Sequence, residues 1–149
     1  MIFDIGCGDT LVAPTAFGID GRKFEHTKHL TNDLCTLSKQ LPLYVGKVNT
    51  VFSSHCLEHI PDDSAAIRDW SEFLSPSGKL ILYLPDTRHY DDVSNPEHVH
   101  SYTYEVFMRW FAASFPWLKV LEHGPHVAKG VSQFAYEDYY SFYLVAARK

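Results

Sequence analysis

This sequence of 149 residues has few cysteines, no long apolar run and no basic cluster, and each shortage argues against a class of protein. Its three cysteines, Cys7, Cys35 and Cys56, are odd in number and widely spaced, so they predict reduced thiols in a cytoplasmic protein rather than a disulfide framework. The longest apolar run, residues 142–147, is far too short to span a membrane, and no basic segment followed by an apolar stretch predicts secretion. With 13 basic against 18 acidic residues, nucleic acid is not an expected partner either.

What the sequence does contain is a series of short apolar segments that alternate with amphipathic or polar ones across one domain, residues 1–149. They predict strands at residues 1–5, 16–20, 25–31, 48–54, 79–84, 118–127 and 140–148. Because residues 79–84 are apolar on both faces, helices are expected on each side of the sheet. The expected fold class is α/β, doubly wound, with a mostly parallel sheet.

Two helices are predicted between these strands, at residues 62–74 and 103–115. The apolar residues that share one face of the first are Ala66, Ile67, Trp70, Phe73 and Leu74, and those of the second are Phe107, Phe111 and Phe115. Residues 75–78 are predicted to be the turn that ends the first helix.

Residues 55–59 read His-Cys-Leu-Glu-His, the H-x-x-E-H pattern of one class of zinc peptidases. Such a site needs His55 and His59 on one face of a helix, one turn apart. Here Pro61 pushes Ile60 out of the helical region, and residues 51–54 end a strand, so the pattern occupies a strand-to-helix connection. A zinc peptidase is therefore the remote alternative, and no metal ligands are assigned.

Residues suited to ligand binding follow four of the predicted strands, whose carboxyl ends meet at one edge of an open α/β sheet. They are Asp4-Ile5-Gly6-Cys7-Gly8, Asp20-Gly21, Asp33-Leu34 and Ser54-His55. Glycines let the backbone approach a ligand closely, and an acid that ends the second strand can accept both hydroxyls of a ribose. The G-x-G-x-x-G fingerprint of dinucleotide sites is incomplete, so adenosine without phosphates fits better than NAD.

In order and spacing these segments resemble the motifs of the class I S-adenosylmethionine-dependent methyltransferases. The matching segments are residues 4–8 (first motif), 18–20 (second-strand acid), 54–60 (the S-x-x-L-E-H-I segment of the small-molecule branch), 74–80 (the L-x-P-G-G-x-L turn), 95–98 (a D-P-T-H-like loop) and 143–149 (last strand). The resemblance covers nearly the whole chain. It implies a sheet of the seven-stranded type with a late antiparallel strand.

The resemblance also implies S-adenosyl-L-methionine as the cofactor and gives its residues. Asp4, Gly6, Cys7 and Gly8 would line the methionine part, Asp20 beside Gly21 the ribose, Asp33 and Leu34 the adenine, and Ser54 and His55 the floor beneath the sulfonium. The chain departs from the family at Thr10, where a third glycine is usual. Only eleven residues separate Gly8 from Asp20, so the usual first crossover helix is expected to be shortened to a loop or turn.

On the acceptor side, the candidate catalytic residues are His59 and His98. His98 follows the fifth strand at its carboxyl end, whereas Glu58 and His59 fit a capping role equally well. The other polar residues near His98 are His89, Asp91, Asp92 and His100, and they favour a solvated loop over a metal site. Cys7 is interpreted as a buried small residue rather than a reactive thiol. Tyr136, Tyr139 and Tyr140 fit either a substrate mouth or a homodimer contact.

The predicted function is methyl transfer from S-adenosylmethionine to a small-molecule or glycan-type acceptor, without nucleic acid or membrane as a partner. Such a displacement mainly requires the protein to align donor and acceptor and to exclude water. A non-catalytic relative that serves as a binding or assembly module is the alternative. Asp20→Ala is expected to weaken cofactor binding at little cost in stability, because an acid at a strand end has no core to fill.

Overall fold

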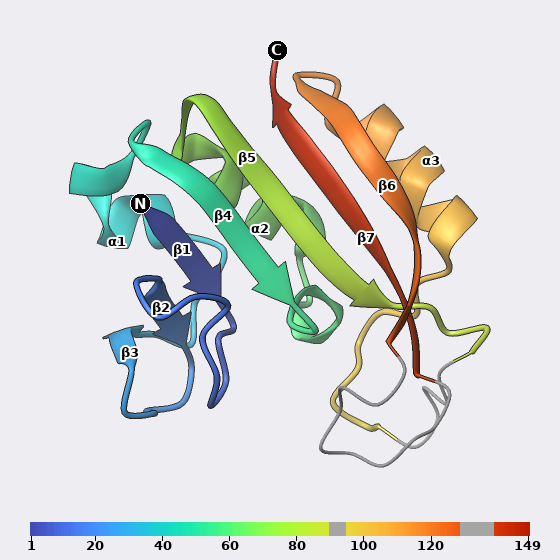
Figure 1. Ribbon diagram of the computed structural model, residues 1–149, viewed down its shortest axis with the longest axis horizontal. Coiled ribbons are helices and arrows are strands. Elements are labelled where there is room, and N and C mark those ends of the chain that lie inside the picture. The colour runs from blue at the N-terminus through green and yellow to red at the C-terminus, as the bar shows by residue number, and fades with distance from the viewer. Residues whose placement is uncertain (90–94, 129–138) are drawn as a thin grey trace.

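The computed structural model describes residues 1–89, 95–128 and 139–149, and its centre is one seven-stranded sheet (Figure 1). The strands are β1 (Ile2–Ile5), β2 (Phe17–Asp20), β3 (Thr27–Leu30), β4 (Val48–Ser54), β5 (Leu74–Pro85), β6 (Leu118–Ala128) and β7 (Tyr139–Arg148). Their order across the sheet is β3-β2-β1-β4-β5-β7-β6. β7 runs antiparallel to β5 and β6, and the other pairs are parallel. The predicted α/β fold is confirmed in its sheet, which is mostly parallel, extends in both directions from β1 and β4, and has a late antiparallel strand.

Helices are few and short. They are α1 (Leu37–Gln40), the 3-10 helices η1 (Pro42–Tyr44) and η2 (Leu57–His59), α2 (Asp63–Glu72) and α3 (Tyr104–Ser114). α2 begins where the sequence places it, because the Asp62 carboxylate accepts a hydrogen bond from the Ala65 N–H at 2.8 Å. α2 and α3 confirm the two predicted helices, whereas the single turns α1, η1 and η2 have no periodicity from which to predict them.

The apolar core lies on one face of the sheet, and the helices of the described residues pack against that face (Figure 1). In β5, Leu80, Leu82 and Leu84 are buried in this core, while Ile81 and Tyr83 on the other face are only half-buried. The predicted apolar faces of both helices belong to the same core. The expectation that helices cover both faces is therefore wrong for the part of the chain described.

The reason lies in the two crossovers that flank β2. A crossover that includes a helix takes at least about 10–12 residues. Residues 21–26, between β2 and β3, are fewer than that, and residues 6–16, between β1 and β2, include Pro14 and form turns and bends. The predicted shortening of the first crossover is confirmed, and the second crossover is shortened as well.

β5 is longer than predicted. It starts at Leu74, which pairs with Val48, and its pairing with β4 shifts between Val48 and Thr50. Residues 75–78 are thus accommodated as an irregularity within the strand instead of a separate turn. None of the helices in the described parts of the chain is long and apolar enough to cross a membrane.

Candidate functional site

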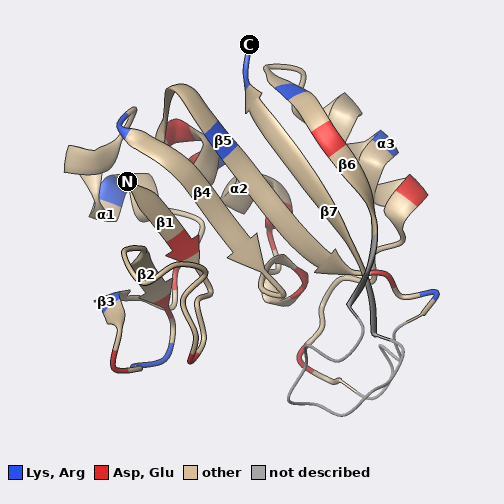
Figure 2. Cartoon of the chain, in the orientation of Figure 1, with Lys and Arg blue, Asp and Glu red and all other residues tan. Residues whose placement is uncertain are grey.

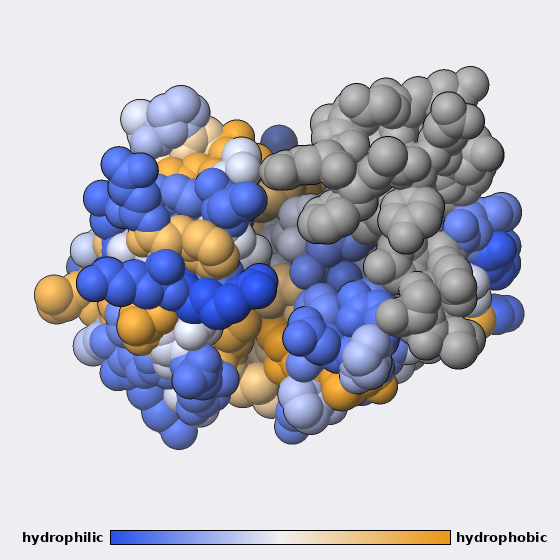
Figure 3. All heavy atoms as spheres, turned by 90° about the horizontal axis from the view of Figure 1, so that it is seen from below, coloured by the Kyte–Doolittle hydropathy of each residue, from blue (hydrophilic) through white to orange (hydrophobic). Residues whose placement is uncertain are grey.

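A cavity of about 480 Å³ lies at the carboxyl ends of the first four strands. β1 and β4 are neighbours in the sheet, and the chain continues from β1 to β2 at one side and from β4 to β5 at the other. Open α/β sheets bind ligands at such a reversal of strand order. Figure 3 views this edge and shows a hollow between the loops of the first three strands and the segments after β4. The lining includes six of the predicted cofactor residues: Gly6, Asp20, Gly21, Asp33, Leu34 and His55.

The loop after β1 depends on two glycines with left-handed backbone. Gly6 has φ +71° and Gly8 has φ +56°, a region that residues with a Cβ rarely adopt. At Gly6 space is also limiting, because an added Cβ would lie 2.5 Å from the Cβ of Cys56. At Gly8 an added Cβ would meet nothing within 4 Å, so only the backbone conformation calls for glycine.

Asp20 ends β2 and holds two loops beside the cavity. It is 6 % exposed, and its carboxylate accepts the Gly8 N–H at 2.9 Å and the Arg22 N–H at 2.7 Å. The carboxylate therefore joins the β1 loop to the turn after β2. Because Asp20→Ala would remove both hydrogen bonds, its loss should cost more stability than expected from its place at a strand end.

The segment after β3 is held by its own side chains. The Asp33 carboxylate accepts hydrogen bonds from the Cys35 N–H at 3.0 Å and from the Thr36 hydroxyl at 2.6 Å. The Leu34 carbonyl accepts the indole N–H of Trp70 at 2.7 Å, which anchors this segment to α2. Asp33 and Leu34 are thereby fixed in the cavity wall.

Four of the predicted cofactor residues are not among the residues that line the cavity: Asp4, Cys7, Gly8 and Ser54. Asp4 is buried, accepts the Val12 N–H at 2.6 Å, and so holds the loop between β1 and β2; burial raises the pKa of its carboxyl. Cys7 lies against Gly18, and burial raises the pKa of its thiol to about 11. A thiol with so high a pKa is unreactive, which agrees with its interpretation as a small buried residue.

The H-x-x-E-H segment does not form a helical zinc site. His55 has φ +48° and lies before η2, which is a single 3-10 turn, and Ile60 is extended, as Pro61 predicts. His55 and His59 line the cavity instead. Glu58, between them in sequence, is fully buried with its carboxylate 3.4 Å from His55 Nδ1.

The loop before α3 packs on η2 and carries His98 with it. The Glu58 carbonyl accepts the N–H groups of Val99 at 2.9 Å and His100 at 3.1 Å. The His98 side chain is 4 % exposed and lies with its Nε2 3.9 Å from the Glu58 carboxylate. The ring centroids of His59 and His98 are 4.7 Å apart, so the structure brings the two predicted catalytic residues together.

Acidic residues gather at this edge of the molecule. Figure 2 shows them at the carboxyl ends of β1 and β2 and around η2. They include Asp4, Asp20, Glu58 and Asp62. An edge with this charge favours a cationic ligand.

Sequence reasoning missed several lining residues, among them Arg22, Asn32, Cys35 and Glu97. Arg22, Asn32 and Cys35 directly follow or precede predicted site residues, so a wider window around each strand end is the signal that finds them. Glu97, in the loop before α3, directly precedes the predicted His98, so the same signal finds it. Asp91, Asp92 and Tyr136 lie outside the described residues, as do the side chains of Tyr139 and Tyr140.

Comparison with known proteins identifies the family. Residues 3–82, more than half of the chain, match the family model described as a methyltransferase domain. The chain belongs to this methyltransferase family. Methyltransferases of this fold use S-adenosylmethionine as their cofactor, so the predicted enzyme class and the predicted cofactor are confirmed. A search of curated proteins found no match.

Solved structures agree on the fold. A methyltransferase dependent on S-adenosylmethionine from Anabaena variabilis is 14 % identical with a TM-score of 0.69, covering 99 % of this chain and 76 % of that one. One from Archaeoglobus fulgidus is 14 % identical with a TM-score of 0.67, over 99 % and 85 %. The 1,6-didemethyltoxoflavin-N1-methyltransferase of Burkholderia thailandensis is 10 % identical with a TM-score of 0.68, over 99 % and 70 %.

Proposed function

We propose that this methyltransferase transfers a methyl group from S-adenosyl-L-methionine to a small-molecule or glycan-type acceptor, with the cofactor in the cavity beside β1 and β4. One observation carries the proposal: six predicted cofactor residues from four separate strand ends line a single cavity of about 480 Å³. That volume is in the range of small-molecule sites, roughly 300–1,000 Å³.

The residues present fit the cofactor. A carboxylate has about four acceptor sites, so Asp20 can accept ribose hydroxyls while it holds the N–H groups of Gly8 and Arg22. Gly6 leaves open the space that a Cβ would fill. Leu34 offers an apolar contact and Asp33 an acceptor for the adenine, and the acidic edge favours a sulfonium cation.

The bound cofactor supplies an electrophilic methyl group, and the chain's residues bind, orient and exclude water. His59 and His98 are the residues we assign to the acceptor side, because His59 lines the cavity and His98 packs against it. A small acceptor is supported by the sequence of residues 54–60 and by the relative from Burkholderia thailandensis, which has 1,6-didemethyltoxoflavin and S-adenosylhomocysteine bound.

The test is calorimetric titration with S-adenosylhomocysteine. The wild-type chain should bind saturably, and Asp20→Ala should bind at least about tenfold more weakly, since each lost charge-assisted hydrogen bond is worth about 1.5–3 kcal/mol. Asp20→Asn should lie between them. Each titration is run below the melting temperature of its variant, because Asp20 also holds two loops.

The matched control is Asp9→Asn, an exposed acid on the β1 loop that does not line the cavity. It should bind like wild type. Absence of binding by the folded wild-type chain at millimolar ligand would favour the non-catalytic binding or assembly module instead. Equal binding by Asp20→Ala and wild type would refute the ribose assignment.

A further inference from the structure

The strongest unexplained feature of the molecule is the Glu58 side chain. It is 0 % exposed, yet within the described residues neither of its carboxylate oxygens has a hydrogen-bond partner. Burial of a carboxylate costs several kcal/mol unless the charge is paired or binds a metal ion. Two histidine nitrogens lie near it, His55 Nδ1 at 3.4 Å and His98 Nε2 at 3.9 Å, and both distances exceed the usual hydrogen-bond distance of about 2.7–3.2 Å.

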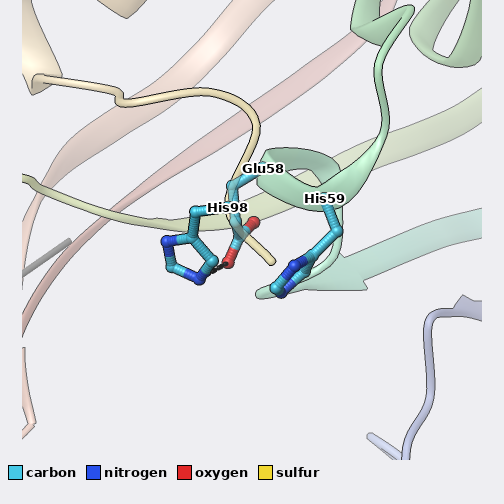
Figure 4. A group of neighbouring side chains, drawn as sticks. All are labelled: Glu58, His59 and His98. Carbon is cyan, nitrogen blue, oxygen red and sulfur yellow. Dashed lines mark ion pairs between the residues drawn. The ribbon is translucent and has the colours of Figure 1, made fainter. Parts of the chain in front are cut away.

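Two histidines flank this carboxylate (Figure 4). One ligand atom each from Glu58, His59 and His98 can be chosen so that all lie within 4.8 Å of one another. Atoms that share a zinc ion, each about 2.0–2.2 Å from it, are at most about 4.4 Å apart. Small side-chain rotations would therefore bring the three groups into one coordination sphere.

We propose that Glu58, His59 and His98 form a binding site for a divalent metal ion of the zinc class. Two imidazoles and one carboxylate are a ligand set that zinc takes in catalytic sites, with a fourth position left for water or substrate. The ion would place a positive charge beside the buried Glu58 carboxylate. The sequence alone assigns no metal here, because His98 is remote from the other two residues in the chain.

The surroundings orient the ligands as metal sites require. The His59 Nδ1–H donates to the Glu97 carbonyl at 3.0 Å, which leaves Nε2 with its lone pair. Metal-binding histidines commonly donate their second ring N–H to such a carbonyl or a carboxylate. The two hydrogen bonds from Val99 and His100 to the Glu58 carbonyl fix the loop that carries His98.

The site borders the cofactor cavity, which His59 and Glu97 also line. An oxygen atom of the methyl acceptor could then take the fourth coordination position of the ion. This step, unlike the metal site itself, rests on the proposed function. A zinc ion lowers the pKa of a bound oxygen ligand strongly, so such an acceptor could lose its proton to water and would need no protein base.

The experiment uses the whole chain purified without a histidine tag, stripped with a chelator and titrated with zinc chloride by calorimetry. The wild-type chain should bind one zinc, and the ion should raise its melting temperature. Glu58→Gln and His98→Asn should each bind at least about 100-fold more weakly, because loss of a direct ligand exceeds the 10–100-fold loss typical of outer-shell changes. Cobalt in place of zinc should give a visible absorption band with wild type only.

His100→Asn is the matched control, since it removes a histidine from the same loop without removing a ligand. It should bind zinc like wild type. The proposal is overturned if the folded wild-type chain takes up no zinc at millimolar concentration, or if Glu58→Gln binds as well as His100→Asn. Titration of zinc-free protein with S-adenosylhomocysteine tests the proposed function separately, so failure of one leaves the other standing.

Discussion

Gly6 and Gly8 both have left-handed backbone in the loop after β1, but for different reasons. At Gly8 only the left-handed backbone calls for glycine. At Gly6 a Cβ would also clash with Cys56, whose side chain is buried beneath the loop. Residue size at position 6 therefore fixes the distance between the loop and the segment after β4. Gly6 and Cys56 both line the cavity, so this distance sets the position of one of its walls.

Alanine at these two positions should separate conformation from space. Gly8→Ala should lower the free energy of unfolding by about 1–2 kcal/mol, the cost of a left-handed residue with a Cβ. Gly6→Ala should cost clearly more, because Cys56 must also move. Urea denaturation of both variants measures the difference. Equal costs would mean that the loop relaxes away from Cys56 without strain.

At the scale of elements, the loop after β5 is joined to α3 by a buried carboxylate. Asp86 accepts hydrogen bonds from Arg88 Nε at 3.0 Å and Arg88 Nη2 at 2.6 Å, and Arg88 also pairs with Glu105 on α3. Burial by itself would raise the pKa of the Asp86 carboxyl, but the hydrogen bonds and charge of Arg88 outweigh it and hold that pKa below its usual value.

This lowered pKa gives a prediction for acid stability. Asp86 should stabilise the fold at pH values above the ordinary 3.8 of an aspartate, and the contribution should be lost as the pH falls through the lower value of the folded state. Asp86→Asn should therefore be less stable at neutral pH, and its stability should fall less steeply below pH 3.8. Thermal melts across the acid range test this.

Glu105→Gln is the control, because its bond to Arg88 is exposed and such pairs contribute about 0–1 kcal/mol. Its acid dependence should resemble that of wild type. Parallel curves for wild type and Asp86→Asn would show that the carboxylate does not couple the loop to folding.

At the scale of the whole molecule, the described core lies on one face of a twisted sheet. Leu82 and Ile81 are neighbours in β5 and face opposite sides; Leu82 pairs with Leu144, and Ile81 with Val145. Leu82 is fully buried beneath the helices, while Ile81 is only half-buried on the other face. Substitutions at these two positions therefore compare how much each face of the sheet contributes to stability within one strand.

Leu82→Ala should lower the free energy of unfolding by about 2–5 kcal/mol, as buried leucines do. Ile81→Ala should cost less than half as much, because its side chain leaves water only in part. Chemical denaturation of the two single variants measures both values. Similar costs would mean that the second face is covered in solution as fully as the first.

The sequence by itself determined the carboxyl ends of β1, β2 and β4, the apolar faces of α2 and α3 and the order of the motifs, because these depend on local periodicity and on residue types at fixed spacing. Only the tertiary structure decided which face of the sheet is covered, since that depends on how few residues remain for each crossover. It also decided that Asp4 and Cys7 lie outside the cavity and that His98 meets Glu58. Such contacts join residues far apart in the chain, and no local pattern records them.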